Sequence, residues 1–116
     1  MSEVSLALAE FEGIPQLKVA GEIDLASAPR LDEMLSVARE RSPGSLIVSL
    51  QRCDYCDSTG LSVLIRHAKE VQNFCLVVPP ESHLRKIFRL TNLEEPLGVV
   101  DTMADAMRRM RKLSAA

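Results

Sequence analysis

The sequence predicts an α/β fold with a mixed, mostly parallel sheet of about five strands and four helices, in the order β-β-α-β-α-β-α-β-α. Apolar runs of strand length alternate with stretches of helical periodicity, which is the pattern of strand–helix–strand units with right-handed crossovers. The first two apolar runs are separated only by a short turn, so these two strands are expected to pair antiparallel. The 116 residues contain no repeat and no linker and suit one hydrophobic core, so a single domain is expected over 1–116.

The first two strands are expected to form a hairpin. Val and Leu alternate with Ser and Ala over 4–8, which is typical of a half-buried strand. Gly13 then turns the chain into a second strand over 14–20. The sequence Gly-Glu-Ile-Asp at 21–24 is expected to leave that strand as an acidic turn.

A helix and a buried strand are expected next. Ser27 is a suitable N-cap, and the Ser-Pro-Gly sequence at 42–44 ends the helix that follows it. Residues 45–50 are almost continuously apolar, which indicates a central strand buried on both faces. The apolar face of the helix is formed by Leu31, Met34, Leu35 and Ala38.

The second half of the chain repeats the alternation. Leu61, Leu64, Ile65 and Ala68 recur at helical spacing, and Asn73 is expected to end their helix in the left-handed conformation. The predicted elements are a helix over 59–72, a strand over 74–78, a helix over 81–90, a strand over 97–100 and a last helix capped by Asp101 or Thr102.

Composition and charge exclude several function classes. The net charge is −2, and the chain has no Trp, one Tyr and three Phe, so no basic surface interleaved with aromatic side chains is expected and direct nucleic-acid binding is not predicted. No apolar run approaches the roughly 20 residues that cross a bilayer, so no membrane insertion is expected. The N-terminus lacks the pattern of a signal peptide, which predicts a cytoplasmic protein.

The most informative segment is Asp-Tyr-Cys-Asp-Ser-Thr-Gly-Leu at 54–61, between a buried strand and a helix. One interpretation is that Ser58 or Thr59 simply caps the helix, which stabilises a helix by about 1 kcal/mol. The other is that the segment presents a hydroxyl that another protein modifies, because a helix N-terminus favours negative charge. Functional residues of such sheets lie beyond the carboxyl ends of the strands, so this segment and the acidic turn at 21–24 are expected at the same end of the sheet.

Catalytic and metal-binding motifs are not found. A serine nucleophile needs a base, and neither His67 nor His83 stands in a triad signature. The glycine patterns of phosphate-binding loops are missing, so no enzyme activity and no cofactor are predicted. Cys53 and Cys56 have the spacing of a redox or half-zinc pair, but a zinc site would need two more ligands, so no metal is predicted.

Three segments together resemble a known family, the STAS domain, which is the sulfate-transporter and anti-sigma-factor-antagonist module. The most specific is CDSTGLSVLI at 56–65, and GEIDLASAPRLDEML at 21–35 and SHLRKIFRLTNLEE at 82–95 are similar to two further blocks of the family. The resemblance runs in order over about residues 4–110, nearly the whole chain.

The resemblance implies a bacterial regulator of transcription. In the stand-alone members, the serine that corresponds to Ser58 is phosphorylated by a GHKL-type serine kinase that is also the anti-sigma factor. The unmodified antagonist binds this kinase and releases the sigma factor, phosphorylation breaks the complex, and a PP2C-type phosphatase resets it. The residues then expected to bind the partner are Glu22, Asp24, Asp57, Ser58, Thr59 and Gly60.

Some features depart from the family pattern, and two alternatives of other classes stay open. Cys56 stands where methionine is common, and Cys53 is three residues before it on the same strand end. Cys75 begins a neighbouring strand from which it can approach either of them if the distance allows, which suggests a redox input to the switch. The connection around Asn73 is about two residues shorter than usual. The alternatives are a STAS subunit of a lipid-transport complex of the ABC type and a nucleotide-binding STAS module.

Overall fold

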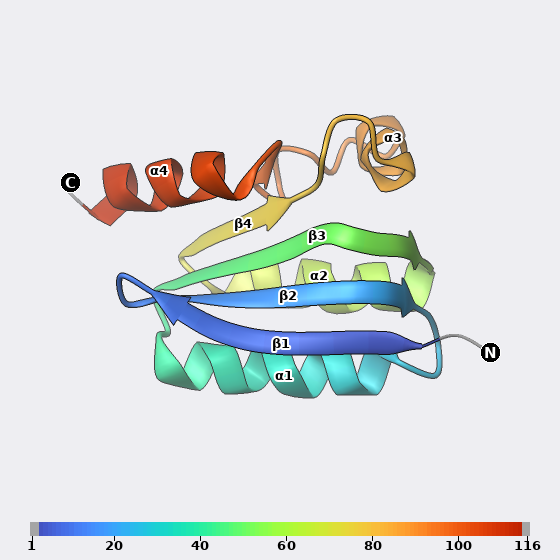
Figure 1. Ribbon diagram of the computed structural model, residues 1–116, viewed down its shortest axis with the longest axis horizontal. Helices are drawn as coiled ribbons and strands as arrows, with labels where there is room; N and C mark the ends of the chain where they lie inside the picture. Colours follow the sequence, from blue (N-terminus) through green and yellow to red (C-terminus); the bar gives the residue numbers. More distant parts are fainter. Residues whose placement is uncertain (1–2, 115–116) are drawn as a thin grey trace.

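The sheet has five strands in the order β1-β2-β3-β4-β5, with β1 antiparallel to β2 and all other neighbours parallel, in a computed structural model that describes residues 3–114 (Figure 1). The predicted fold class and element order are confirmed. The elements are β1 (Val4–Phe11), β2 (Ile14–Ile23), α1 (Ala28–Arg41), β3 (Ser45–Cys56), α2 (Ser58–Glu70), β4 (Asn73–Val77), α3 (His83–Leu90), β5 (Val99–Val100) and α4 (Met103–Ser114).

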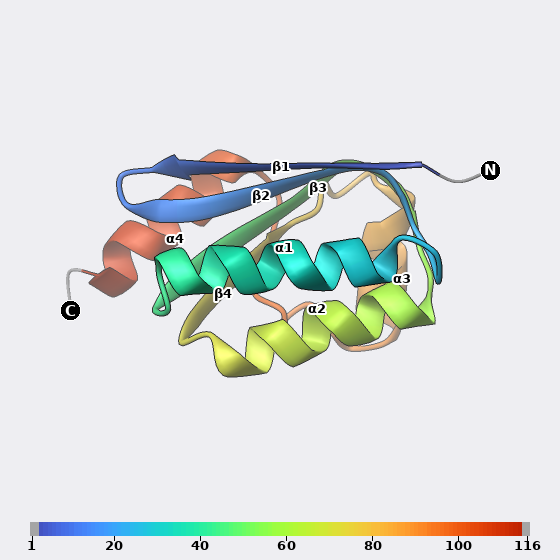
Figure 2. The same ribbon diagram turned by 90° about the horizontal axis from the view of Figure 1, so that it is seen from below.

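The helices divide between the two faces of the sheet. Helices α1 and α2 lie side by side on one face, and α4 lies on the other (Figure 2). Because successive side chains of a strand point to opposite faces, Leu46 and Val48 of β3 pack in the α1–α2 core, whereas Ile47 packs in the α4 core. Helix α3 adds Leu84 and Phe88 to the α1–α2 core. The central strand is therefore buried on both faces, as predicted.

Strands β2 and β3 run further than the sequence pattern predicts. The turn at Gly13 is confirmed, with Glu12 and Gly13 both at positive φ. The expectation that residues 21–24 leave the strand is wrong for the first three of them, because β2 stays paired with β3 as far as Ile23. Ile23 is fully buried, so the acidic turn contains one residue of the core.

The expected end of the second helix is also wrong. Helix α2 ends at Glu70, and Asn73 is already the first residue of β4, paired with Ser45. The chain leaves the helix early because Val71 is extended and buried in the core. The asparagine that takes the left-handed conformation is Asn92, with φ +58°, just after α3. Within residues 3–114, no helix combines the length and the apolar character needed to cross a bilayer.

Candidate functional site

Residues 21–24 and 54–61 meet at the carboxyl ends of β2 and β3. The register pairs Glu22 with Tyr55 and Ile23 with Cys56. Beyond the last pair, the backbone N–H of Asp57 donates to the carbonyl oxygen of Ile23 at 3.0 Å. The expectation that both segments lie at one end of the sheet is confirmed, and main-chain hydrogen bonds hold the start of α2 against the end of β2.

Asp57 caps helix α2, and neither of the two hydroxyl residues after it does. The Asp57 side chain accepts a hydrogen bond from the backbone N–H of Gly60 at 3.0 Å, and its backbone is extended. The capping interpretation of Ser58 or Thr59 is therefore wrong, because the carboxylate one residue earlier already fills that place. Ser58 occupies the first helical position, where its side chain is exposed, and its hydroxyl makes no hydrogen bond to any residue of the described range 3–114.

Gly60 sets how closely α2 approaches the sheet. A Cβ atom at this position would lie 2.4 Å from Cγ2 of Ile23 and 3.0 Å from Sγ of Cys56. The first distance is shorter than real Cβ contacts and the second is tighter than most of them, so a side chain here would push the helix start away from β2. Gly60 is itself buried, and it positions Ser58 rather than presenting a surface of its own.

Asp24 and Ser27 organise the loop between β2 and α1. One carboxylate oxygen of Asp24 accepts hydrogen bonds from the backbone N–H groups of Ala26 at 3.1 Å and Ser27 at 3.0 Å. The Ser27 hydroxyl accepts from the backbone N–H of Asp24 at 2.9 Å and lies 3.1 Å from the carbonyl oxygen of Glu22. Ser27 is at the N-cap position of α1 as predicted, but its hydroxyl ties the loop together and does not bond the first turn of the helix.

The three cysteines do not form one cluster. Cys53 and Cys56 lie at the candidate site, but Cys75 packs in the α4 core on the opposite face and pairs with Ile47, roughly 20 Å along β3 from Cys53. Since a disulfide needs Cα atoms within about 7 Å, the expectation that Cys75 can approach the other two is wrong.

The chemistry of the two remaining thiols does not favour redox activity. Burial raises the pKa of Cys53 to about 11, and burial together with the nearby Cys53 and Asp57 raises the pKa of Cys56 to about 12. The reactive thiolate is therefore scarce at neutral pH. No group of three potential metal ligands occurs in the described part of the chain.

Two exposed apolar side chains flank the site, and the sequence pattern did not reveal them. Leu25, directly after Asp24, is 74% exposed, and Tyr55, paired with Glu22, is 48% exposed. Aromatic side chains such as tyrosine are enriched in protein-binding surfaces. A tyrosine between two aspartates of the 54–57 segment was the available signal for one of them.

His67 is a buried structural residue and no base for Ser58. Its Nε2 lies 2.6 Å from Oδ1 of Asp32 on α1, and its Nδ1 lies 3.2 Å from a guanidinium nitrogen of Arg39. A guanidinium can only donate, so Nδ1 accepts, and the imidazole proton is on Nε2 facing the carboxylate. His67 also lies nine residues beyond Ser58, about 13 Å along the helix. Its role is to join α1 to α2.

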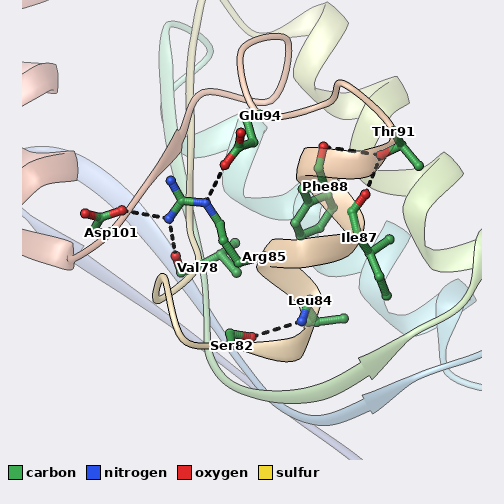
Figure 3. A network of polar contacts seen from close by, with 9 residues as sticks. All are labelled: Val78, Ser82, Leu84, Arg85, Ile87, Phe88, Thr91, Glu94 and Asp101. Carbon is green, nitrogen blue, oxygen red and sulfur yellow. Dashed lines mark hydrogen bonds and ion pairs between the residues drawn. The ribbon is translucent and has the colours of Figure 1, made fainter.

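Arg85 fixes helix α3 beside the site (Figure 3). Its guanidinium donates to Glu94 at 2.7 Å, to Asp101 at 2.7 Å and to the carbonyl oxygen of Val78 at 2.8 Å. These bonds tie α3 to the end of β4 and to the start of α4. A hollow of about 260 Å³ separates α3 from the end of β3 and is lined by Gln51, Cys53, Asp54, Pro79, Glu81, Ser82 and His83. By fixing α3, Arg85 keeps the start of this helix, which lines one side of the hollow, in place beside the end of β3.

The sequence and the fold both lead to one family. The family model of the STAS domain matches residues 5–106. The chain belongs to the STAS domain family. Among known proteins, this STAS domain is similar to the anti-sigma-F factor antagonist RsfB of Mycobacterium tuberculosis, with 26% identity over 110 residues that cover 93% of this chain and 90% of RsfB.

Two further likenesses come from other organisms. An anti-sigma-B factor antagonist of Staphylococcus aureus is 29% identical over 87 residues, which cover 72% of this STAS domain and 81% of that protein. The crystal structure of an anti-sigma factor antagonist from Mycobacterium paratuberculosis has a TM-score of 0.86 at 24% identity, covering 94% of this chain and 95% of that one. The last likeness is one of fold.

Proposed function

We propose that this STAS domain is an anti-sigma factor antagonist whose binding to its partner is switched off by phosphorylation of Ser58. The observation that carries the proposal is the exposed Ser58 hydroxyl, without a hydrogen bond to residues 3–114, on a helix start that Asp57 caps and Gly60 positions. The names of its relatives, anti-sigma-F and anti-sigma-B factor antagonists, support the general role. The role is one of binding, not of catalysis.

The physical effect of a phosphate on Ser58 would fall on the complex more than on the fold. A phosphoserine carries a charge of about −1.5 to −2 at neutral pH. The helix N-terminus attracts that charge, but Asp57 already uses the backbone N–H of Gly60. The phosphate therefore stays at the surface, where it meets the partner with both bulk and a charge that is costly to desolvate.

The partner under this proposal is a GHKL-type serine kinase that is also the anti-sigma factor, and a PP2C-type phosphatase resets the switch. The binding surface includes Glu22, Asp24, Asp57, Ser58 and Thr59, and Gly60 acts by positioning the helix. Leu25 and Tyr55 supply the apolar contacts that such a surface needs, because aromatic and apolar anchors carry much of the binding energy of an interface.

The test is phosphorylation of the purified protein by its cognate kinase and ATP, followed by peptide mapping. Wild-type protein and Ser62→Ala are expected to carry phosphate on Ser58, whereas Ser58→Ala is expected to carry none. Ser62 is the matched control, because it is an exposed serine one turn further along α2 whose hydroxyl donates to the carbonyl oxygen of Ser58 at 2.9 Å. Phosphate on Thr59 or Ser62 of the wild-type protein, or an unchanged rate in Ser58→Ala, would contradict the assignment.

A further inference from the structure

The α4 face of the sheet is left partly uncovered. Helix α4 packs along β4 and β5 and also covers Ile47 of β3 and the start of β2, at Ile14 and Gln16. The rest of β2, from Lys18 onward, and the carboxyl half of β3 carry no helix on that face (Figure 1). A hollow of about 350 Å³ lies there, on the side of the sheet opposite α1 and α2, and is lined by Lys18, Val19, Ala20, Ser49, Gln51 and Arg52.

An irregularity in the pairing of β2 and β3 creates this hollow. Lys18 pairs with Ser49, but the next pair is Ala20 with Arg52, so one residue of β2 faces two residues of β3. An extra residue in a strand changes which face the following side chains occupy. Arg52 thus shares a face with Lys18 and Ser49, while Cys53 turns into the α1–α2 core, where it is 5% exposed.

The hollow concentrates positive charge. Lys18 and Arg52 are exposed, and neither forms an ion pair with any residue between 3 and 114. Their backbones are roughly 8 Å apart, two residues along the sheet and one strand across. On the neighbouring strand β1, the residues paired with Lys18 and Ala20 are Ala7 and Ser5, which are small and uncharged. Neither of these two β1 residues fills the hollow or neutralises the charge of Lys18 and Arg52.

The floor of the hollow supplies neutral hydrogen-bonding groups. Ser49 is only 4% exposed, and its hydroxyl is held weakly, at 3.3 Å from the side-chain oxygen of Gln51 and 3.4 Å from the backbone nitrogen of Gln51. Contacts this long leave the hydroxyl free to turn toward a ligand. The site thus combines two cations with a serine hydroxyl and an amide.

We propose that this hollow binds a small ligand with two linked phosphate groups, a diphosphate. Lys18 and Arg52 bracket the two phosphates, because a guanidinium and an ammonium are the cations that proteins use for phosphate. The hollow of about 350 Å³ exceeds what a single phosphate fills, and the backbones of Lys18 and Arg52, roughly 8 Å apart, leave room for two. The proposal is independent of the role of Ser58, which lies at the end of the sheet on the start of α2.

The test is a titration of the full chain with pyrophosphate, followed by the backbone amide signals in NMR spectra. Shifts are expected to concentrate at residues 18–20 and 49–52. The double variant Lys18→Gln/Arg52→Gln is expected to bind at least tenfold more weakly. The control variant Lys69→Gln/Arg89→Gln removes the same charge from two exposed positions of α2 and α3 that form no ion pairs within residues 3–114, and it is expected to bind like the wild type.

Three outcomes would overturn the proposal. One is the absence of saturable shifts, and another is an equal loss of binding in both double variants, which would indicate attraction to diffuse surface charge. The third is equal affinity for orthophosphate and pyrophosphate, which would remove the second phosphate from the site. Because all four substituted side chains are exposed, circular dichroism is expected to show that both double variants fold.

Discussion

Helices α1 and α2 both begin just after a parallel strand, and each has a serine at its start, yet the two serines have different environments. Ser27 is buried, with its hydroxyl held by Asp24 and Glu22. Ser58 stands one position later relative to its helix, where Asp57 has taken the capping place, and its hydroxyl is exposed. The comparison teaches that a serine at a helix start makes structural hydrogen bonds unless a neighbouring side chain, here Asp57, already makes them.

The largest effect is expected on the affinity for the partner when the Ser58 hydroxyl is replaced by a charged group. Ser58→Asp is expected to weaken binding to the kinase about a hundredfold, which corresponds to about 2.8 kcal/mol, because the charge must be desolvated in the complex. Ser58→Ala is expected to bind like the unmodified protein. Isothermal titration calorimetry measures both, and equal affinities for the two variants would show that Ser58 is outside the contact surface.

The next effect tests the packing that positions Ser58. Gly60→Ala is expected to lower the free energy of unfolding by about 1–3 kcal/mol, since its Cβ would collide with Ile23. Gly44 is the matched control, because a Cβ there meets nothing within 4 Å. Urea unfolding of Gly60→Ala and Gly44→Ala measures the difference, and similar losses in both would contradict the close approach of α2 to β2.

The two serines can then be compared directly. Ser27→Ala is expected to cost about 1–2 kcal/mol of stability, because it removes the hydrogen bonds that close the loop before α1. Ser58→Ala is expected to change stability by less than about 0.5 kcal/mol, as exposed substitutions usually do. Chemical denaturation of both variants checks this. The comparison fails if Ser58→Ala destabilises the protein as much as Ser27→Ala.

The smallest effect concerns the contact that joins the two helices. The hydrogen bond from His67 and the charge of Arg66 lower the pKa of Asp32 below its ordinary value, against the opposing effect of burial. A carboxyl with a lower pKa in the folded state stabilises the fold above its unfolded pKa, and the contribution is lost as the pH falls through the folded value. Asp32→Asn is therefore expected to be less stable than the wild type at pH 7, with the difference shrinking below about pH 4. Thermal unfolding across pH measures this, and a constant difference would contradict it.

The alternation of apolar runs was enough to predict the order of the elements, because burial on both faces leaves β3 continuously apolar and burial on one face leaves a helical stripe. Element ends were less predictable. Gly21 and Glu22 interrupt the apolar pattern of the sequence, but both continue β2, because their main chain stays paired with β3. Asparagine is common just after a helix, but Asn73 begins β4, because the helix has already ended at Glu70 and Val71 is extended and buried in the core.

The sequence by itself determined the fold class, the family and the segment that holds the candidate switch, because periodicity and the Asp-Ser-Thr-Gly-Leu motif are local properties of the chain. Only the tertiary structure decided the role of each group. In the folded protein Asp57 caps α2, Ser58 is exposed and Gly60 is buried. Cys75 and Cys53 lie on opposite faces of the sheet. These outcomes depend on which strands lie side by side and in which register, and contacts between distant segments leave no trace in local spacing.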